Sequence, residues 1–304
     1  MPERTPYMNP GAPVHGPRKG FPAAANQHRR IYAIAALLLW ILLPAATLRA
    51  YVPHPLHMLD LMLGKPKKIH SVVMDQRMTI HALDPQTPPD IFKCKVYFQW
   101  PKGYRMEQVG ETGHRIQVVN GDDNVVIRDG FIEPEPAGLV DLYHDPLYFR
   151  TRSDMARRLS QQGIDINIAG PGLWQDRPQW VLGARYPDTA KSQLWINKES
   201  FRPLGWLINP TGTRGYPVWE IRYLNWQNRQ GFRYPGQITF YQDEVLIREI
   251  EIMGVRVNVK LTPDLFDLHK LRVRYPVRTQ EQSPGQPVNE VEQALEDFSK
   301  MYRN

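Results

Sequence analysis

The segment Ile91-Phe92-Lys93-Cys94-Lys95-Val96-Tyr97-Phe98-Gln99-Trp100 alternates apolar and polar side chains. Its even-numbered residues are all apolar, and Lys93, Lys95 and Gln99 stand between them. Successive side chains of a β-strand point to opposite faces of a sheet, so a period of two marks a strand with one buried face. The segment therefore predicts an antiparallel sheet with one face on the core and one toward water.

The same alternation recurs on both sides of this segment. In the run 71–83, Val72, Met74, Met78 and Ile80 share one face. Asn-Gly and Asp residues at 120–124 are typical of a hairpin turn. Further strands are predicted at 104–107, 115–119, 125–128, 179–186, 192–197, 204–209, 218–226, 237–242 and 246–258. Together these runs predict a mainly β protein of roughly ten or eleven strands with a few helices.

Three segments carry helical patterns. Residues 56–63 have helical spacing and end at Gly64, a common residue just after a helix. Ser153 is a candidate N-cap for a helix ending before Gly163. The stretch 279–287 reads as a linker, and 288–302 reads as an amphipathic helix. That last helix either docks back on the domain or contacts an envelope protein partner.

The amino-terminal region predicts export. Residues 31–48 form an uncharged apolar stretch, which as a helix is about 27 Å long and spans the hydrocarbon core of a bilayer. Arg29 and Arg30 precede it, which predicts that 1–30 stay in the cytoplasm. Residues 31–50 are either an uncleaved signal anchor or a signal peptide, and Leu48-Arg49-Ala50 departs from a good cleavage site. Residues 51–278 form the predicted β domain and 279–304 the tail.

The net charge of +7 does not indicate a nucleic-acid binder. Residues 1–50 hold six basic side chains and one acidic side chain, which leaves 32 basic and 30 acidic residues in the rest. Nucleic-acid binding needs basic residues on the folded surface, where they displace counterions. The excess charge is therefore interpreted as a signal for membrane topology.

The sequence holds no recognisable catalytic constellation. Cys94 is the single cysteine and alternates with lysines, so it is predicted to be a buried small hydrophobe. Among the nine histidines only the His144-Asp145 pair joins a carboxylate, and no metal-ligand spacing is present. Nucleophile elbows, phosphate loops and dinucleotide fingerprints are also absent. We expect no enzyme activity, no cofactor and no metal.

Two stretches resemble the LolA/LolB-like superfamily, the lipoprotein-sorting proteins of the periplasm. One is Arg233-Tyr234-Pro235-Gly236-Gln237-Ile238-Thr239-Phe240-Tyr241-Gln242, followed by the closing strand and Phe266-Asp267-Leu268. The other is the strand–turn–strand from Gln193 to Leu204. The resemblance covers about 55–269 and implies an unclosed antiparallel β-barrel of about eleven strands with a helical plug. It also implies a cavity that takes acyl chains of lipoproteins or lipids.

The alternation assigns large, deformable side chains to the inner face of such a barrel. Each methylene group of an acyl chain buried there contributes about 0.8 kcal/mol, and methionines adapt to ligands of variable shape. The same side chains could instead fill a dry core. The predicted ligand-binding residues are Met74, Met78, Phe92, Phe98, Met106, Trp219, Tyr223 and Phe240.

The sequence thus predicts a periplasmic protein that is tethered to the inner membrane through 31–48, or secreted to the periplasm after cleavage. It would hold acyl chains of lipoproteins or lipids in lipoprotein sorting or lipid transport. Soluble carriers of the family have a cleaved signal, and its outer-membrane receptors carry a lipidated cysteine that is missing here. The alternative is an envelope sensor or scaffold that uses the same fold for protein contacts.

Overall fold

The computed structural model describes residues 52–64, 68–84, 86–101, 103–134, 143–209 and 218–278. The predicted membrane segment 31–48 and the predicted helix 288–302 lie outside these residues. Within the described ranges, no helix has both the length and the apolar character needed to span a bilayer.

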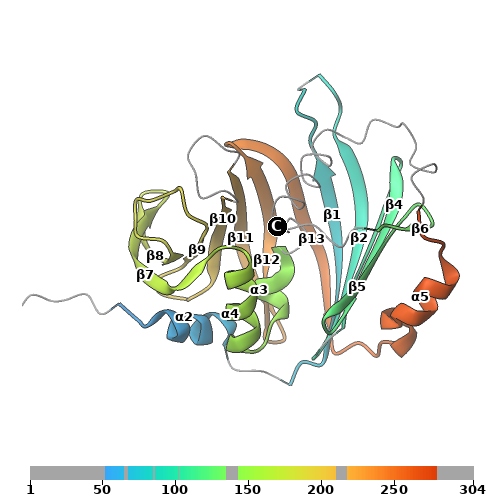
Figure 1. The fold of residues 1–304 in the computed structure, drawn as a ribbon, viewed down its shortest axis with the longest axis horizontal. Helices are drawn as coiled ribbons and strands as arrows, with labels where there is room; N and C mark the ends of the chain where they lie inside the picture. The colour runs from blue at the N-terminus through green and yellow to red at the C-terminus, as the bar shows by residue number, and fades with distance from the viewer. Residues whose placement is uncertain are drawn as a thin grey trace, which may run out of the picture. The chain divides into compact units, whose positions relative to one another are not determined.

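Thirteen strands form one antiparallel sheet (Figure 1). Their spatial order is β6-β5-β4-β3-β2-β1-β13-β12-β11-β10-β9-β8-β7. The two end strands, β6 and β7, do not pair with each other, so the sheet is unclosed. The strands are β1 (Ser71–Ile80), β2 (Asp90–Gln99), β3 (Gly103–Gly110), β4 (Gly113–Asn120), β5 (Asp123–Arg128), β6 (Phe131–Ile132), β7 (Asp165–Trp174), β8 (Arg177–Gly183), β9 (Gln193–Ile196), β10 (Pro203–Ile208), β11 (Trp219–Arg229), β12 (Phe232–Gln242) and β13 (Val245–Val257).

The unclosed antiparallel sheet of the sequence prediction is confirmed, but the strand number is larger than expected. The short β6 and the edge strand β7 account for the difference. Asp165-Ile-Asn-Ile-Ala-Gly-Pro-Gly breaks the alternation and contains Gly and Pro, residues that sequence patterns place in turns. An edge strand tolerates both, because one of its sides needs no hydrogen-bonded partner.

The sheet is continuous because β1 pairs with β13. Their register runs from Val72 opposite Val257 to Ile80 opposite Arg248, with a bulge that leaves Met253 exposed. Asn258 strengthens the junction, since its side chain accepts a hydrogen bond from the His70 backbone nitrogen at 2.8 Å. Strands from the two ends of the domain thus meet at the centre of the sheet.

The hairpin of β11 and β12 is longer than the sequence predicted. Gly236 lies in β12 opposite Asn225, where a Cβ atom would come within 2.8 Å of the Gln227 side chain and 2.9 Å of the Asn225 carbonyl oxygen. Asn225 adopts a positive φ of 55°. The Pro-Gly pair, which looks like a strand breaker, is therefore a local distortion inside a paired strand.

Helices cover both faces of the sheet. We call α2 (Pro55–Leu63), α3 (Asp145–Tyr148) and α4 (Arg152–Gln161) the inner cover, since the sheet curves around α3 and α4 (Figure 1). The outer cover is the 3-10 helix η2 (Pro263–Phe266) with α5 (Leu268–Arg274), which packs against β4 and β5. The sequence did not predict the outer cover. Thr151 and not Ser153 caps α4, because its hydroxyl accepts from the Asp154 backbone nitrogen.

The core follows this division into faces. Two apolar clusters lie between the sheet and the inner cover, and a third lies under the outer cover. Ile116 and Ile127 of the third cluster face α5 and Leu271. One face that the alternation assigned to water is thus buried locally by α5.

Candidate functional site beneath the inner cover

All eight predicted ligand-binding residues lie on the inner face of the sheet. Each is at most 7% exposed. Met74, Phe98 and Met106 belong to one inner cluster. Met78, Phe92, Trp219, Tyr223 and Phe240 belong to the other inner cluster. The alternation therefore placed them together correctly, while their role in ligand binding stays a prediction.

The inner cover fills the space in front of these residues. From α2 come Met58 and Leu59, and from α4 come Met155 and Leu159, all fully buried in the same cluster as Met78 and Phe240. These helices lie on the sheet and are held there by side-chain packing. The inner face is thus covered by separate short helices whose contacts are mainly apolar.

Tyr223 of β11 and Trp100, which directly follows β2, hold the two ends of α3. The Tyr223 hydroxyl donates to the Tyr143 carbonyl oxygen at 2.8 Å. The Trp100 indole nitrogen donates to the Tyr148 carbonyl oxygen at 2.5 Å. A helix of four residues has little stability of its own, so these contacts define its position.

The start of α3 carries a buried carboxyl group. Asp145 is 2% exposed and forms an ion pair with Arg158 of α4, with 3.0 Å between Oδ2 and Nε. Burial raises the pKa of Asp145 to about 7, although the Arg158 charge opposes that shift. The His144 imidazole lies 3.8 Å away and stacks on Tyr104 with 3.8 Å between ring centroids. The inner cover therefore contains a carboxyl group that can titrate near neutral pH.

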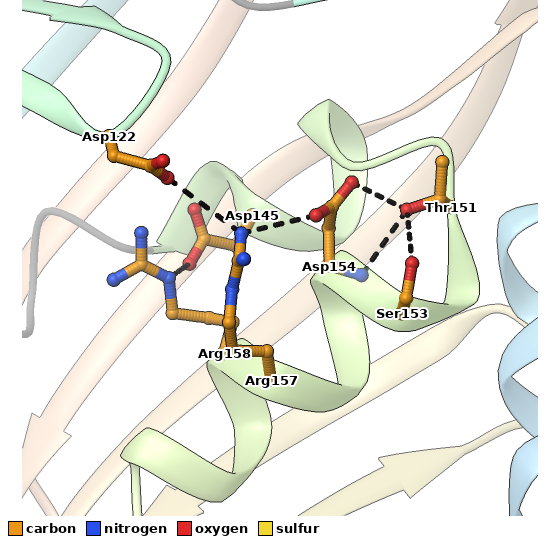
Figure 2. A network of polar contacts seen from close by, with 7 residues as sticks. All are labelled: Asp122, Asp145, Thr151, Ser153, Asp154, Arg157 and Arg158. Atoms are coloured by element: carbon orange, nitrogen blue, oxygen red, sulfur yellow. Dashed lines mark hydrogen bonds and ion pairs between the residues drawn. The ribbon is translucent and has the colours of Figure 1, made fainter.

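Figure 2 shows this ion pair beside a second set of polar contacts on α4. Arg157 pairs with Asp154 at 3.1 Å and with Asp122 of the β4–β5 turn at 3.8 Å. Both Arg157 contacts are exposed to solvent, so we expect each to contribute little to stability. The Asp145–Arg158 pair is the part of the network that burial makes important.

A cavity of about 90 Å³ opens at the edge of the inner cover. A water molecule occupies about 30 Å³ in the liquid, so the cavity is far too small for a whole acyl chain. Phe149, Phe232 and Trp226 in its wall pack against or belong to the two inner clusters. Part of the cavity wall is therefore also part of the apolar interior. Its lining is Met62, Leu63, Gly64, Pro146, Leu147, Phe149, Arg150, Arg202, Pro203, Trp226, Gly231, Phe232 and Arg233.

Other candidate chemistry is weak in the described residues. Cys94 is buried as predicted, and burial raises the pKa of its thiol to about 12, so a reactive thiolate is disfavoured. Within the described part of the chain, no group of three or more His, Cys, Asp or Glu residues could hold a metal ion. The His144-Asp145 pair faces aromatic rings and Arg158.

Sequence reasoning missed the polar residues of the site. Asp145 and Arg158 are 13 positions apart and become partners only when α3 and α4 pack together. Arg150, Arg202 and Arg233 come from separate elements and share no local motif. The odd pairing of His with Asp at 144–145 was the single local signal.

The described residues thus define a class: an unclosed, curved antiparallel sheet whose apolar inner face is covered by short helices. Solved structures of similar fold include a LolA superfamily protein from Nitrosomonas europaea, with 14% identity, a TM-score of 0.45, and coverage of 71% of this chain and 98% of that one. They also include an outer membrane lipoprotein-sorting protein domain from Vibrio parahaemolyticus, with 8% identity, a TM-score of 0.44, and coverage of 71% and 97%.

The MucB protein of Pseudomonas aeruginosa, solved in complex with MucA, is similar at 12% identity and a TM-score of 0.25, with coverage of 74% and 63%. No family model and no curated protein matches the chain. The family that the sequence resembles is therefore among those with similar solved structures. With TM-scores below 0.5, these likenesses carry no argument about ligands or partners.

Proposed function

We propose that this protein binds acyl chains between the inner face of its sheet and its inner cover. The observation that carries the proposal is the construction of that interior. Its walls are large apolar side chains, its covering helices are short and separate from the sheet, and a cavity at their edge reaches the surface.

The free-energy cost of exchanging the inner cover for a ligand is small in this proposal. Moving α3 and α4 away exposes apolar surface, and an acyl chain in their place covers it again. Ten to twelve methylene groups at about 0.8 kcal/mol each can replace much of what the helices bury. Met74, Met78 and Met106 in the wall suit chains of variable shape.

The proposed cellular setting is the periplasm, with the protein tethered to the inner membrane. The apolar stretch 31–48, with basic residues before it, supports export of the β domain and retention of the anchor. A retained anchor favours holding and presenting acyl chains of lipids or lipoproteins over shuttling them.

Native mass spectrometry of the full chain, released from membranes in a neutral detergent, tests this proposal. We expect co-purifying species with the mass of lipids, and fewer of them for Met78→Glu, which places a charge on the inner face. As a matched control, Met253→Glu changes an exposed methionine of β13 and should retain the lipid. A ligand-free protein that also fails to bind a fluorescent fatty acid would rule out the proposal.

A second candidate function is an envelope sensor or scaffold. One observation favours it: a cavity of about 250 Å³ on the outer face, lined partly by Trp174, Tyr186 and Trp195. Tyr186 is exposed and Trp174 is half-buried there, whereas Trp195 forms the buried floor. Aromatic side chains are enriched in protein interfaces. Crosslinking in membranes distinguishes the two functions. A stable complex that survives Met78→Glu but is lost on deletion of 288–304 favours the scaffold.

A further inference from the structure

The cavity at the edge of the inner cover has a polar composition that acyl binding alone does not explain. Three arginines line it, and its lining contains no acidic residue. Arg150 follows α3, Arg202 precedes β10, and Arg233 lies in β12. Three separate elements thus bring positive charge to one small space.

Arg150 is the most unusual of the three. Its Nε and Nη2 atoms are buried and have no hydrogen-bond partner among the described residues. Its guanidinium carbon lies 3.7 Å from the centre of the Trp100 ring, which orients the group. Burial lowers the pKa of Arg150 to about 10, and no neighbouring carboxylate opposes that shift. A half-buried cation without a counter-charge is unfavourable.

Arg202 repeats this pattern. Its Nε atom is also buried and unpartnered among the described residues, and its guanidinium carbon lies 5.8 Å from the centre of the Trp226 ring. Some buried or half-buried arginines elsewhere in the described domain have carboxylate partners, as Arg222 has Glu220 at 2.6 Å and Arg158 has Asp145 at 3.0 Å. Among the described residues, the three arginines of this cavity have no carboxylate partner, and they gather in one lining without an acidic side chain.

We infer that this cavity binds the anionic headgroup of the acyl ligand, with Arg150, Arg202 and Arg233 pairing with a carboxylate or phosphate. A volume of about 90 Å³ suits such a group, and planar guanidinium groups bind both anions through paired hydrogen bonds. The apolar wall of the cavity would direct the attached chain toward the inner clusters. This inference rests on the proposed function and adds the class of ligand: an anionic amphiphile.

The test compares lipids that share their chains and differ in charge. Binding of dipalmitoyl phosphatidic acid and dipalmitoylglycerol to the full chain in neutral detergent is measured by native mass spectrometry. We expect phosphatidic acid to bind at least about tenfold tighter than the uncharged diglyceride, since each charge-assisted hydrogen bond contributes on that scale.

The variant that tests the arginines combines Arg150→Gln, Arg202→Gln and Arg233→Gln. We expect the affinity ratio of phosphatidic acid to diglyceride to fall about tenfold or more. The matched control combines Arg177→Gln, Arg185→Gln and Arg229→Gln, which remove the same charge from exposed positions outside the cavity. This control should keep the wild-type ratio. Thermal unfolding of both variants verifies that they fold. Arg150→Lys keeps the positive charge but loses the paired N–H donors of the guanidinium group, so it should lower the affinity ratio less.

The possible outcomes distinguish the headgroup site from acyl binding itself. Equal binding of charged and uncharged lipids overturns the headgroup site and leaves acyl binding standing. Failure of every lipid to bind overturns both. If the affinity ratio of phosphatidic acid to diglyceride falls equally in the control variant, general surface charge causes the preference. That result also overturns the site. Saturable binding of inorganic phosphate that depends on Arg150, without a preference for phosphatidic acid, would assign the cavity to a free anion instead.

Discussion

The two faces of the sheet are covered by helices in different ways. The outer cover follows β13 in the chain, buries Phe266, Leu268 and Leu271 against the sheet, and carries exposed ion pairs such as Arg272 with Asp123 at 2.7 Å. The inner cover hides a carboxyl group, Asp145, and borders a cavity with unpartnered arginine atoms. The outer cover therefore resembles a permanent part of the core. The inner cover has features that a stable core avoids and a replaceable cover can use.

The largest expected effect comes from Phe98→Ala. Phe98 is fully buried and contacts the rings of Trp100, Tyr104 and Tyr148. We expect a loss of about 3–5 kcal/mol in the free energy of unfolding, part of which palmitic acid should restore by filling the space. Thermal unfolding with and without palmitic acid measures this.

Phe266→Ala is the matched change under the outer cover, where Phe266 is also buried. It should destabilise the protein on a similar scale, and palmitic acid should restore nothing beyond its effect on the wild type. Equal restoration in both variants would remove the distinction between the two covers.

Asp145→Asn should change the dependence of stability on pH. The folded pKa of about 7 lies above the unfolded value of about 3.9. The contribution of Asp145 to the free energy of unfolding is therefore complete below about pH 4 and is lost as the pH rises through about 7. Between pH 5 and 7 the wild type should lose about 1.4 kcal/mol per pH unit relative to Asp145→Asn. Thermal unfolding of the two proteins across this range provides the measurement.

Asp123→Asn serves as the control with the opposite sign. The hydrogen bond from Arg272 lowers the pKa of Asp123, so its contribution is present above the unfolded pKa and is lost on acidification. Between pH 5 and 7 this variant should follow the wild type in parallel. If the free energies of unfolding of Asp145→Asn and the wild type run parallel between pH 5 and 7, the Asp145 carboxyl group does not titrate in that range.

Tyr223→Phe tests the attachment of α3 by a single hydrogen bond. Removing the hydroxyl leaves the Tyr143 carbonyl oxygen without this donor, at an expected loss of about 1 kcal/mol. Hydrogen exchange of backbone amides in α3 and α4 should quicken about fivefold. Tyr234→Phe removes a hydroxyl that donates to Gln227, and should leave that exchange unchanged. Unchanged exchange in Tyr223→Phe would mean that apolar packing alone positions α3.

The smallest effect is expected for Arg272→Gln in the outer cover. Its ion pair with Asp123 is exposed, so the loss should stay below about 1 kcal/mol and shrink in high salt. Lipid binding should not change. A clear loss of lipid affinity would show that the outer cover also communicates with the inner face.

Much of the sheet could be predicted because alternation is a local property. Phe92, Phe98 and Trp219 were placed on the inner face by parity alone, and the structure places all three there. Edge strand β7 could not be recognised, since Gly and Pro remove the pattern at an edge that tolerates them. The basic helix α5 has only seven residues and a weak pattern, so its burial depends on the strands that it covers.

The candidate site was predictable only for its apolar half. The alternation within a strand predicts which face an apolar residue occupies. The role of a charged residue depends on its partners, which come from distant parts of the chain. Arg150 and Arg202 are 52 positions apart, and only the packing of α3 beside β10 and the β11–β12 hairpin brings them to one cavity. The raised pKa of Asp145 likewise comes from burial that no local pattern expresses.

The open sheet has one further consequence, for association between molecules. An unclosed sheet presents backbone groups at its two ends, and a free strand edge can recruit another chain and start aggregation. Here β6 is only two residues long and Ile132 bridges to Val277 in parallel fashion. At the other end β7 carries Pro171, which has no N–H to donate. Both ends are thus poor templates for a strand of another molecule. The sheet can therefore stay unclosed without promoting aggregation through its edges.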